Sequence, residues 1–474
     1  MSEKWNVYES FQALLELGPF HIALEVILLA WVVWLLVAAK SRPRSIKLTK
    51  KEEEQLLAEW TPEPLLSSTP DPNHPALHTR TVHGKLGHYV DLGNGPLLNL
   101  ASNDYLRFSE NKSIEAAALE CLHQYGVGSC GPRSFYGTTA MHIELESRIS
   151  EFFNVENAVM YAYGFSTMAS AIPCYAKSGD VIFVDEAVYF PIQRGLQASR
   201  SRILYFRHND TEHLKELLEQ QARDDKQDPK KASATRRFLV TEGLYFNTGD
   251  ICPLPELVAF RRQYKLRFFL DESCSFGVLG PTGKGVMEHY NIPVHEVDLL
   301  MCSLEYAGAT TGGFTAGTRF VVEHQRLSGL GYAFSASLPP MLAASAKQML
   351  DVLEEEGSVL APALRDRCRQ MHKKLLEALP AQVTVVGLEV SPIKHLNLSA
   401  VTSLSEEQQE KTLHKVVKEV EERGVAVVVA SLRRSEELRP PPPSIRLGVS
   451  VKLTDQQIDT AVAALADAFR VVLL

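Results

Sequence analysis

Residues 303–314, SLEYAGATTGGF, join small residues to a closing pair of glycines. This composition is typical of backbone that must approach a ligand closely, and such a loop often carries a reactive side chain. Here the loop contains no Lys and no His, and Tyr306 stands near its centre. The loop therefore predicts a ligand site without an obvious nucleophile.

Two other stretches place polar groups where a ligand could bind. In YAYGFSTMASAIPCY, a strand ends near Tyr161, and a helix beginning at Ser166 or Thr167 would offer N–H groups to a phosphate. An ordinary helix cap is the alternative. In RFFLDESCSFGVLGPTGKGV, a buried strand ends at Asp271, where α/β proteins place ligand contacts. Capping of the next turn is the alternative there.

A glycine-rich loop from Gly126 to Gly137 precedes a helix that carries His142 and Glu146 one turn apart. The loop matches neither the dinucleotide fingerprint nor the phosphate loop of nucleotide hydrolases. His142 and Glu146 lack a third ligand, so no metal site is expected. The loop is either a surface loop or the lining of a cleft.

The order of these features resembles one family, the α-oxoamine synthases, from about Asn99 to the C-terminus. The similar stretches are NLASNDYL, GPRSFYGTT, DESCSFGVLGPTGKG, FSASLPP and SIRLGVS. The resemblance implies the fold type I aminotransferase architecture and a pyridoxal 5'-phosphate enzyme that joins an amino acid to an acyl-CoA with loss of carbon dioxide. Within the family, the chain resembles the non-catalytic long-chain-base subunit of serine palmitoyltransferase. That complex condenses L-serine with palmitoyl-CoA to 3-ketosphinganine, the first step of sphingolipid synthesis.

Three positions depart from the catalytic pattern that the resemblance implies. Active members carry a Lys six residues before the glycine pair, in a Thr-Lys-Ser-Phe-Gly context, where this chain has Tyr306. Cys274 replaces a His, and Tyr189 replaces the His that stacks on the cofactor ring. Without the Lys amine no Schiff base forms. The resemblance therefore implies a chain inactive by itself, with the cofactor bound covalently by a partner and Asp271 left as a vestigial contact to its ring nitrogen.

The resemblance also implies a catalytic partner subunit, since fold type I sites are built at a dimer interface from loops of both chains. Two hydroxyls in FSASLPP are candidate donors to the partner's cofactor phosphate, and three residues of the glycine-rich loop are candidates to line the cleft. Packing of the interface is the alternative role for all five. They are Ser335 and Ser337, and Cys130, Arg133 and Tyr136.

Two other interpretations stay open. One is an autonomous pyridoxal phosphate transferase in which Lys284 or another Lys substitutes, although no Lys occurs between Lys284 and Lys347. The other is a pure membrane scaffold or regulatory subunit. Arg446 resembles the family's substrate-carboxylate Arg, and its role here is either residual or structural.

The elements that position these residues follow from the hydrophobic pattern. From about residue 97, short apolar runs alternate with amphipathic helical runs, which predicts βαβ units and a largely parallel sheet. After Pro340, a long helix and further strands predict a smaller α+β domain. The predicted division is an N-terminal segment 1–20, a transmembrane helix 21–40, a juxtamembrane helix and Pro-rich linker 41–96, a large domain 97–345 and a small domain 346–474.

Residues 22–39 are apolar except for Glu25, and at about 1.5 Å per residue they cover most of a bilayer core of roughly 30 Å. A signal peptide and a buried core helix are the alternatives. A signal peptide begins with basic residues, whereas this segment follows acidic ones. Basic residues come after it and predict a cytosolic C-terminal body by the positive-inside rule. They are Lys40, Arg42, Arg44, Lys47, Lys50 and Lys51.

The resemblance places this single span in the endoplasmic reticulum membrane, where it offers a docking helix to small membrane regulatory subunits. Residues 1–20, with aromatic and Leu side chains at helical spacing, either lie on the membrane surface or lead into the span as a plain helix.

Composition excludes several classes of protein. The 474 residues are 45% hydrophobic and 22% charged, which is typical of a globular protein with a large core. The net charge of −8 argues against a general nucleic-acid binder. The seven Cys show no metal-ligand spacing, and their odd number suits a reducing compartment.

Overall fold

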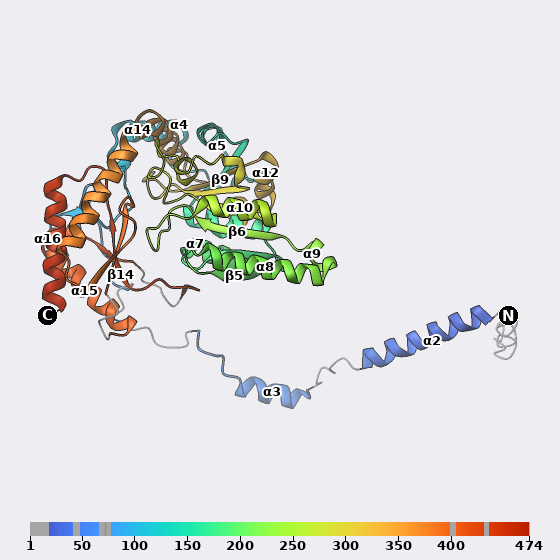
Figure 1. Ribbon diagram of the computed structural model, residues 1–474. Coiled ribbons are helices and arrows are strands. Elements are labelled where there is room, and N and C mark those ends of the chain that lie inside the picture. The colour runs from blue at the N-terminus through green and yellow to red at the C-terminus, as the bar shows by residue number, and fades with distance from the viewer. Residues whose placement is uncertain are drawn as a thin grey trace. The chain divides into compact units, whose positions relative to one another are not determined.

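The computed structural model describes residues 19–40, 48–65, 72, 77–398, 404–430 and 436–473. The chain forms two compact units, residues 1–74 and 75–474, and each is described by itself (Figure 1). The predicted surface segment before Pro19 lies outside the described residues, as do Arg42, Arg44 and Lys47.

The first unit consists of two helices, α2 (Pro19–Lys40) and α3 (Lys50–Glu59). Residues Pro19–Val37 have a mean hydropathy of 2.4 and no buried side chain, so α2 is long and apolar enough to cross a bilayer. Helix α3 begins with a capping box, in which Thr49 and Glu52 each satisfy a backbone N–H of the other. It is charged and exposed throughout, as the sequence predicts for a juxtamembrane helix.

A seven-stranded sheet forms the centre of the second unit. Four neighbouring pairs are parallel, and β9 runs antiparallel to its two neighbours at one side, so the prediction of a largely parallel sheet is confirmed. In spatial order the strands are β3 (Asn157–Tyr161), β9 (Gly313–Gly317), β8 (Leu299–Ser303), β7 (Arg267–Asp271), β6 (Arg237–Glu242), β4 (Val181–Asp185) and β5 (Arg202–Phe206).

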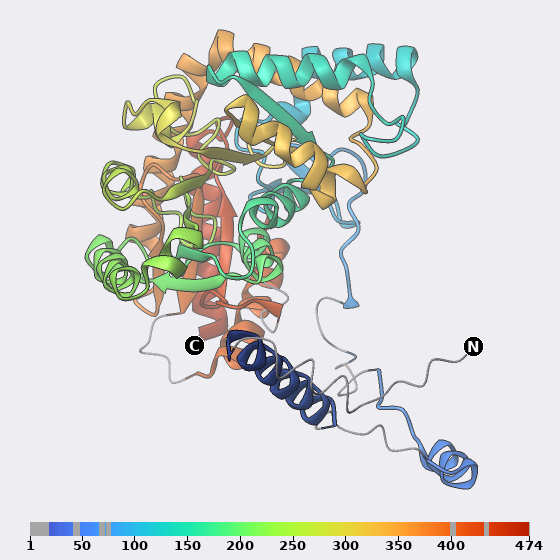
Figure 2. The same cartoon turned by 90° about the vertical axis from the view of Figure 1, so that its right-hand side faces the viewer.

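Helices cover both faces of this sheet. The connections after β3 and β4 run across the sheet towards β5, and the connections after β5 and β6 run in the opposite direction. Because such crossovers are right-handed, the helices of the first two connections and those of the last two lie on opposite faces. Figure 2 shows α6 (Gly164–Tyr175) and α7 (Phe190–Ser199) on one face and α8 (Thr211–Gln227) and α10 (Leu254–Tyr264) on the other. The carboxyl ends of β6, β7 and β8 therefore meet at one edge.

Further helices surround the sheet. Helices α4 and α5 pack against the long helix α14, and α12 and α13 follow β9. Their bounds are α4 (Lys112–Tyr125), α5 (Ala140–Phe153), α9 (Pro229–Ala234), α11 (Val286–His289), α12 (Arg319–Ser328), α13 (Leu330–Ala333) and α14 (Pro340–Ala378).

The C-terminal region is an α+β layer with its own antiparallel sheet. That sheet has the order β10 (Val383–Val386), β11 (Ile393–Leu398), β14 (Ser444–Gly448) and β13 (Val428–Val429), next to α15 (Glu406–Glu422) and α16 (Asp455–Leu473). A third sheet pairs β1 (Tyr89–Asp91) and β2 (Pro96–Asn99) with β12 (Val425–Ala426), so early strands join the C-terminal region. Helix α14 runs continuously through residue 345, and the predicted division there stays a prediction.

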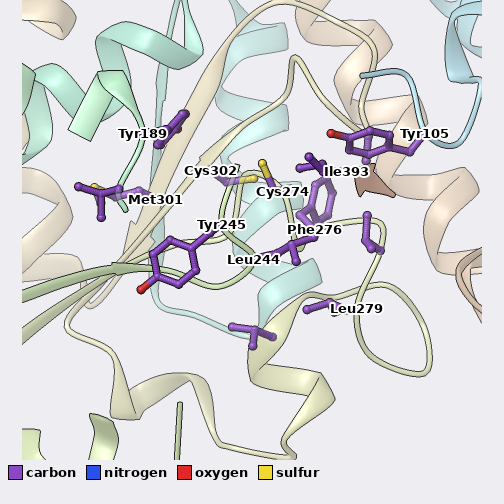
Figure 3. Close-up of a cluster of buried hydrophobic side chains, with 14 of the residues drawn as sticks. Tyr105, Tyr189, Leu244, Tyr245, Cys274, Phe276, Leu279, Met301, Cys302 and Ile393 are labelled. Atoms are coloured by element: carbon purple, nitrogen blue, oxygen red, sulfur yellow. The ribbon is translucent and has the colours of Figure 1, made fainter. Parts of the chain in front are cut away.

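One continuous hydrophobic core joins the sheet to the C-terminal region. Figure 3 shows part of it, where Cys274, Phe276 and Cys302 from the central sheet and its loops lie in one cluster with Ile393 of β11. All four side chains are buried. Because this packing is continuous, loops from both regions are held firmly at the carboxyl edge of the sheet.

Candidate functional site

Asp271, the last residue of β7, lies buried at the carboxyl edge of the sheet. Its Oδ1 accepts a hydrogen bond from the backbone N–H of Ser273 at 2.8 Å, whereas Oδ2 has no hydrogen-bond partner among the residues the structure describes. Burial raises the pKa of Asp271 to about 6, although the neighbouring hydroxyls of Ser273 and Tyr189 act in the opposite direction. A buried carboxylate oxygen without a donor is costly and marks a place for one.

Three aromatic rings occupy the space beside this carboxylate. The ring of Phe246 lies 5.5 Å from that of Tyr306 and 6.0 Å from that of Tyr189, between centroids. The guanidinium of Arg446 lies over the Phe246 ring, 4.9 Å from its centroid. Burial raises the pKa of the Tyr306 and Tyr189 phenols well above its usual value, so both stay neutral. The sequence-predicted positions 189 and 306 thus come together around Phe246.

Glu242, the last residue of β6, fixes two of these aromatic residues. Its carboxylate accepts the backbone N–H of Tyr189 at 2.8 Å and of Phe246 at 2.9 Å. Burial, with Asp271 nearby, raises the pKa of Glu242 well above its usual range. Sequence reasoning missed Glu242 and Phe246, although an acid that ends a buried strand beside β7 is a signal of the same kind as Asp271.

The two remaining positions at this edge are held by packing and backbone contacts. Burial raises the pKa of the Cys274 thiol well above its usual value, which makes a reactive thiolate unfavourable. Arg446 donates from Nη2 to the carbonyl of Ala101 at 2.8 Å, and its buried Nε has no partner in the described part of the chain. The neighbouring His395 bonds the Phe246 carbonyl at 2.9 Å, and burial lowers its pKa to about 4.

The segment FSASLPP packs directly against the glycine-rich loop. The Ser337 hydroxyl lies 3.0 Å from the carbonyl oxygen of Gly131 and 2.5 Å from that of Gly137, and Pro132 pairs with Ala336 in an isolated β-bridge. A Cβ at Gly137 would lie 1.9 Å from the Gly131 oxygen, so only glycine fits there. The Ser337 hydroxyl is therefore engaged within this chain, whereas Ser335 makes only a 3.5 Å contact to the Ala336 carbonyl.

The three predicted cleft residues separate in the structure. Cys130 is exposed and lines a surface hollow of about 410 Å³ together with Tyr163, Thr311 and Ser337. Tyr136 is fully exposed. Both Cys130 and Tyr136 adopt left-handed backbone, with φ of 61° and 65°, which is unfavourable for residues other than glycine.

Arg133 instead points into the protein. Its Nη1 lies 2.7 Å from Oε1 of Glu146, a pair with side chains only 3% and 5% exposed, and Arg326 approaches the other Glu146 oxygen at 3.0 Å. His142 donates from Nε2 to the Leu338 carbonyl at 2.7 Å and accepts the N–H of Thr139 at Nδ1. The groups singled out on α5 therefore connect α5 to neighbouring elements.

The start of α6 differs from the sequence prediction. The helix begins at Gly164, two residues before the predicted start at Ser166, and both the Ser166 and the Thr167 hydroxyls donate to the Tyr163 carbonyl. The alternative of an ordinary cap by Ser166 or Thr167 was therefore wrong, and phosphate binding at this helix start stays a prediction. Instead, the first backbone N–H, that of Gly164, donates to Oε1 of Glu305 at 3.0 Å. Glu305 precedes Tyr306 in the loop, and sequence reasoning missed it.

These residues do not fit a covalently held pyridoxal phosphate, the cofactor that the resemblance implies. Asp271 fits, because its orphaned oxygen could accept a ring N–H. Tyr306 does not, because a phenol cannot form an imine. Lys284 donates to the Phe152 carbonyl at 3.0 Å, and Lys347 pairs with Glu144 at 2.6 Å, so neither replaces it.

The comparisons with known proteins agree with this architecture. The family described as aminotransferase class I and II matches residues 95–465. The chain is 40% identical to serine palmitoyltransferase 1 of Dictyostelium discoideum, over 91% of this chain and 90% of that protein. It is 38% identical to long chain base biosynthesis protein 1c of Oryza sativa, over 94% and 90%.

Solved structures show the same fold. A serine palmitoyltransferase from S. paucimobilis with a bound PLP-myriocin aldimine superposes with a TM-score of 0.72, covering 83% of this chain and 92% of that one at 24% identity.

Proposed function

Because the chain belongs to the class I and II aminotransferase family, with relatives named serine palmitoyltransferase 1 over nine-tenths of its length, we propose that it is the non-catalytic, membrane-anchored subunit of a serine palmitoyltransferase. With a lysine-bearing partner it would condense L-serine with palmitoyl-CoA to 3-ketosphinganine. In that complex the partner, and not this chain, holds pyridoxal phosphate covalently.

The observation that carries the proposal is Tyr306. It lies at the carboxyl edge of the sheet among Phe246, Tyr189 and Asp271, in the loop where the family's Schiff-base Lys is expected. A neutral phenol cannot form the imine on which the cofactor's chemistry depends. Asp271 and Arg446 remain as the frame of a site without its nucleophile.

A partner surface is favoured by exposed apolar side chains in the chain segments that line the hollow beside Cys130 or directly adjoin its lining residues. We call this group the apolar rim. Large exposed apolar side chains concentrated in a few segments mark a contact with another molecule. Its members are Val127, Phe135, Tyr136, Tyr163, Phe165, Leu330 and Phe334, each 45% exposed or more.

At this surface, Ser335 is the better candidate to contact the partner's cofactor phosphate. Its hydroxyl makes only a weak local contact, whereas the Ser337 hydroxyl is bound to two carbonyls of the glycine-rich loop. We assign Ser337 to holding that loop, which presents Cys130 and Tyr136 to the partner. Arg133 supports the loop from within.

The membrane anchor rests on α2. Its composition and exposure suit a single span, and the resemblance to serine palmitoyltransferase suits the endoplasmic reticulum membrane, with residues 75–474 in the cytosol. The same helix would offer small membrane regulatory subunits a place to dock.

The test is to purify the full chain alone and together with its lysine-bearing partner from the same membranes. Borohydride reduction and peptide mapping locate any pyridoxyl-lysine, and condensation of serine with palmitoyl-CoA is measured in parallel. We expect the modified lysine and the activity only when the partner is present, with the lysine in the partner. A pyridoxyl-lysine in this chain, or condensation by this chain alone, would contradict the proposal.

A pure scaffold is the second candidate, and the internal engagement of Ser337 favours it. Ser335→Ala distinguishes the two functions, since it removes a hydroxyl whose one contact among the described residues is a weak one at 3.5 Å. Lower turnover by an intact complex supports completion of the partner's site. Unchanged turnover and cofactor affinity would support scaffolding.

A further inference from the structure

The start of α6 already holds an anion supplied by the chain itself. Oε1 of Glu305 accepts the backbone N–H of Gly164 at 3.0 Å, and the Glu305 N–H donates to the Ser303 hydroxyl at 3.1 Å, which braces the loop in that position. A helix of 12 residues carries partial positive charge at its first N–H groups. The carboxylate therefore lies where a ligand phosphate would be favoured.

The loop also fills the space over this helix start. A Cβ built on Gly164 would lie 2.0 Å from the Ser303 hydroxyl oxygen and 3.1 Å from Oε2 of Glu305. A Cβ on Gly313 would lie 2.3 Å from the Thr167 hydroxyl and 3.1 Å from the Gly164 Cα. The loop 303–313 and the start of α6 thus touch so closely that glycine is required on both sides.

The two hydroxyls nearest the helix start donate their hydrogen bonds within the chain. Ser166 donates to the Tyr163 carbonyl at 2.8 Å and Thr167 donates to the same oxygen at 3.0 Å. These two hydroxyl donors and the Gly164 N–H, which is bound to Glu305, are therefore all used within the chain.

We propose that the Glu305 carboxylate is a built-in substitute for a phosphate and makes this chain reject phosphate-bearing ligands, the cofactor included. The inference deepens the proposed function and rests on it. With Tyr306 in place of Lys, the chain cannot bind the cofactor covalently, and with Glu305 at the helix start it binds the cofactor phosphate weakly. The chain therefore does not compete with its partner for the cofactor.

The electrostatic effect is large enough to measure. A phosphate monoester carries between one and two negative charges at neutral pH, and bringing it within about 4 Å of a carboxylate costs about 1 kcal/mol or more even in water, which is roughly five- to tenfold in affinity. The Glu305 side chain is exposed, so the estimate for water applies to it.

The experiment uses the full chain in detergent and compares the unsubstituted protein with Glu305→Gln, which removes the charge and keeps the shape. Glu323→Gln, at an exposed position on α12, is the matched control. Binding of inorganic phosphate and of pyridoxal 5'-phosphate is measured separately by equilibrium dialysis, so that a plain phosphate seat is distinguished from one that needs the cofactor ring. We expect Glu305→Gln to bind about five- to tenfold more tightly than both other proteins.

A second experiment introduces a lysine at the position of Tyr306. Tyr306→Lys alone should give little pyridoxyl-lysine at position 306 after borohydride reduction, and Glu305→Gln with Tyr306→Lys should give several-fold more. Thermal unfolding checks that each variant is folded, and Glu305→Thr replaces Glu305→Gln if the latter is not. Equal binding by the Gln variants at positions 305 and 323, or full modification of Tyr306→Lys alone, would overturn the inference.

The outcome also separates this inference from the proposed function. If the unsubstituted chain yields no pyridoxyl-lysine and Glu305→Gln gains no affinity, only the role of Glu305 is refuted. If the unsubstituted chain itself yields a pyridoxyl-lysine, the proposed function is refuted, whatever Glu305→Gln does.

Discussion

At the scale of single residues, the roles of the site side chains differ in how far they could be predicted from the sequence. Tyr306 could be predicted from the sequence because its spacing to Gly312 is local. Glu305, its neighbour, could not be assigned a role, because its partner Gly164 lies 141 residues away. Glu242 and Phe246 were missed for the same reason, since their contacts to Tyr189 and Tyr306 form only when separate strand ends meet.

Asp271 should make the stability of the free chain depend on pH. Its pKa of about 6 in the folded chain exceeds that of an unfolded Asp, about 4, so the folded state holds the proton more tightly between these values. Its contribution is present below about pH 4 and is lost as the pH rises through 6. Asp271→Asn should therefore raise the free energy of unfolding by about 2–3 kcal/mol at pH 7 and by little at pH 4.

Chemical denaturation of the full chain at both pH values checks this prediction. Glu120→Gln, which removes an exposed carboxylate on α4, is the control and should change neither value. An equal effect of Asp271→Asn at pH 4 and pH 7 would show that the buried carboxylate is not the titrating group.

Arg133 should behave as a structural residue. Arg133→Ala removes a buried charge-assisted hydrogen bond and leaves Glu146 with Arg326 as its ion-pair partner, so it should lower the free energy of unfolding by about 2 kcal/mol. Arg369→Ala, which breaks an exposed ion pair with Asp366, should cost less than about 1 kcal/mol. If Arg133→Ala instead leaves the free chain stable and weakens only its assembly, Arg133 contacts the partner.

At the scale of elements, the sequence pattern predicted the alternation of strands and helices well, because each element buries its own apolar face. The strand ending at Tyr161, the strand ending at Asp271 and the long helix after Pro340 all occur as predicted. Two details depended on distant contacts. Helix α6 begins at Gly164 because Glu305 caps it, and the Ser337 hydroxyl turns inward because the glycine-rich loop offers it two carbonyls.

Helix α2 should fail as an anchor when a charge is placed at its centre. Leu28 is near the middle of the apolar stretch Pro19–Val37, and an Arg there should oppose insertion by about 3 kcal/mol. We expect Leu28→Arg to move the chain from the membrane pellet into the soluble fraction after alkaline extraction. His21→Arg, near the end of the helix, should stay with the pellet, and equal behaviour of both variants would contradict a spanning α2.

At the scale of the whole molecule, fold and surface give different kinds of information. The fold is that of the aminotransferase class I and II family, and at the carboxyl edge of its sheet the ring of Tyr306 contacts that of Phe246 while Glu305 binds the start of α6. The exposed apolar side chains of the rim lie in segments at or near the hollow that Cys130 lines. Under the proposed function, the chain contributes to condensation only when the lysine-bearing partner covers that surface.

The apolar rim should therefore decide assembly. Phe334, which is 71% exposed, lies two residues before Ala336, which pairs with Pro132 of the glycine-rich loop. Burying an Asp at a partner interface in its place should cost about 3 kcal/mol or more, which is at least about a hundredfold in affinity. We expect Phe334→Asp to abolish co-purification with the lysine-bearing partner while the free chain keeps its melting temperature.

Leu376→Asp, at a 60% exposed position on α14, carries the same charge change outside the rim and should co-purify normally. If Phe334→Asp assembles as well as Leu376→Asp, the partner binds another face, and the apolar rim must be assigned to a different contact.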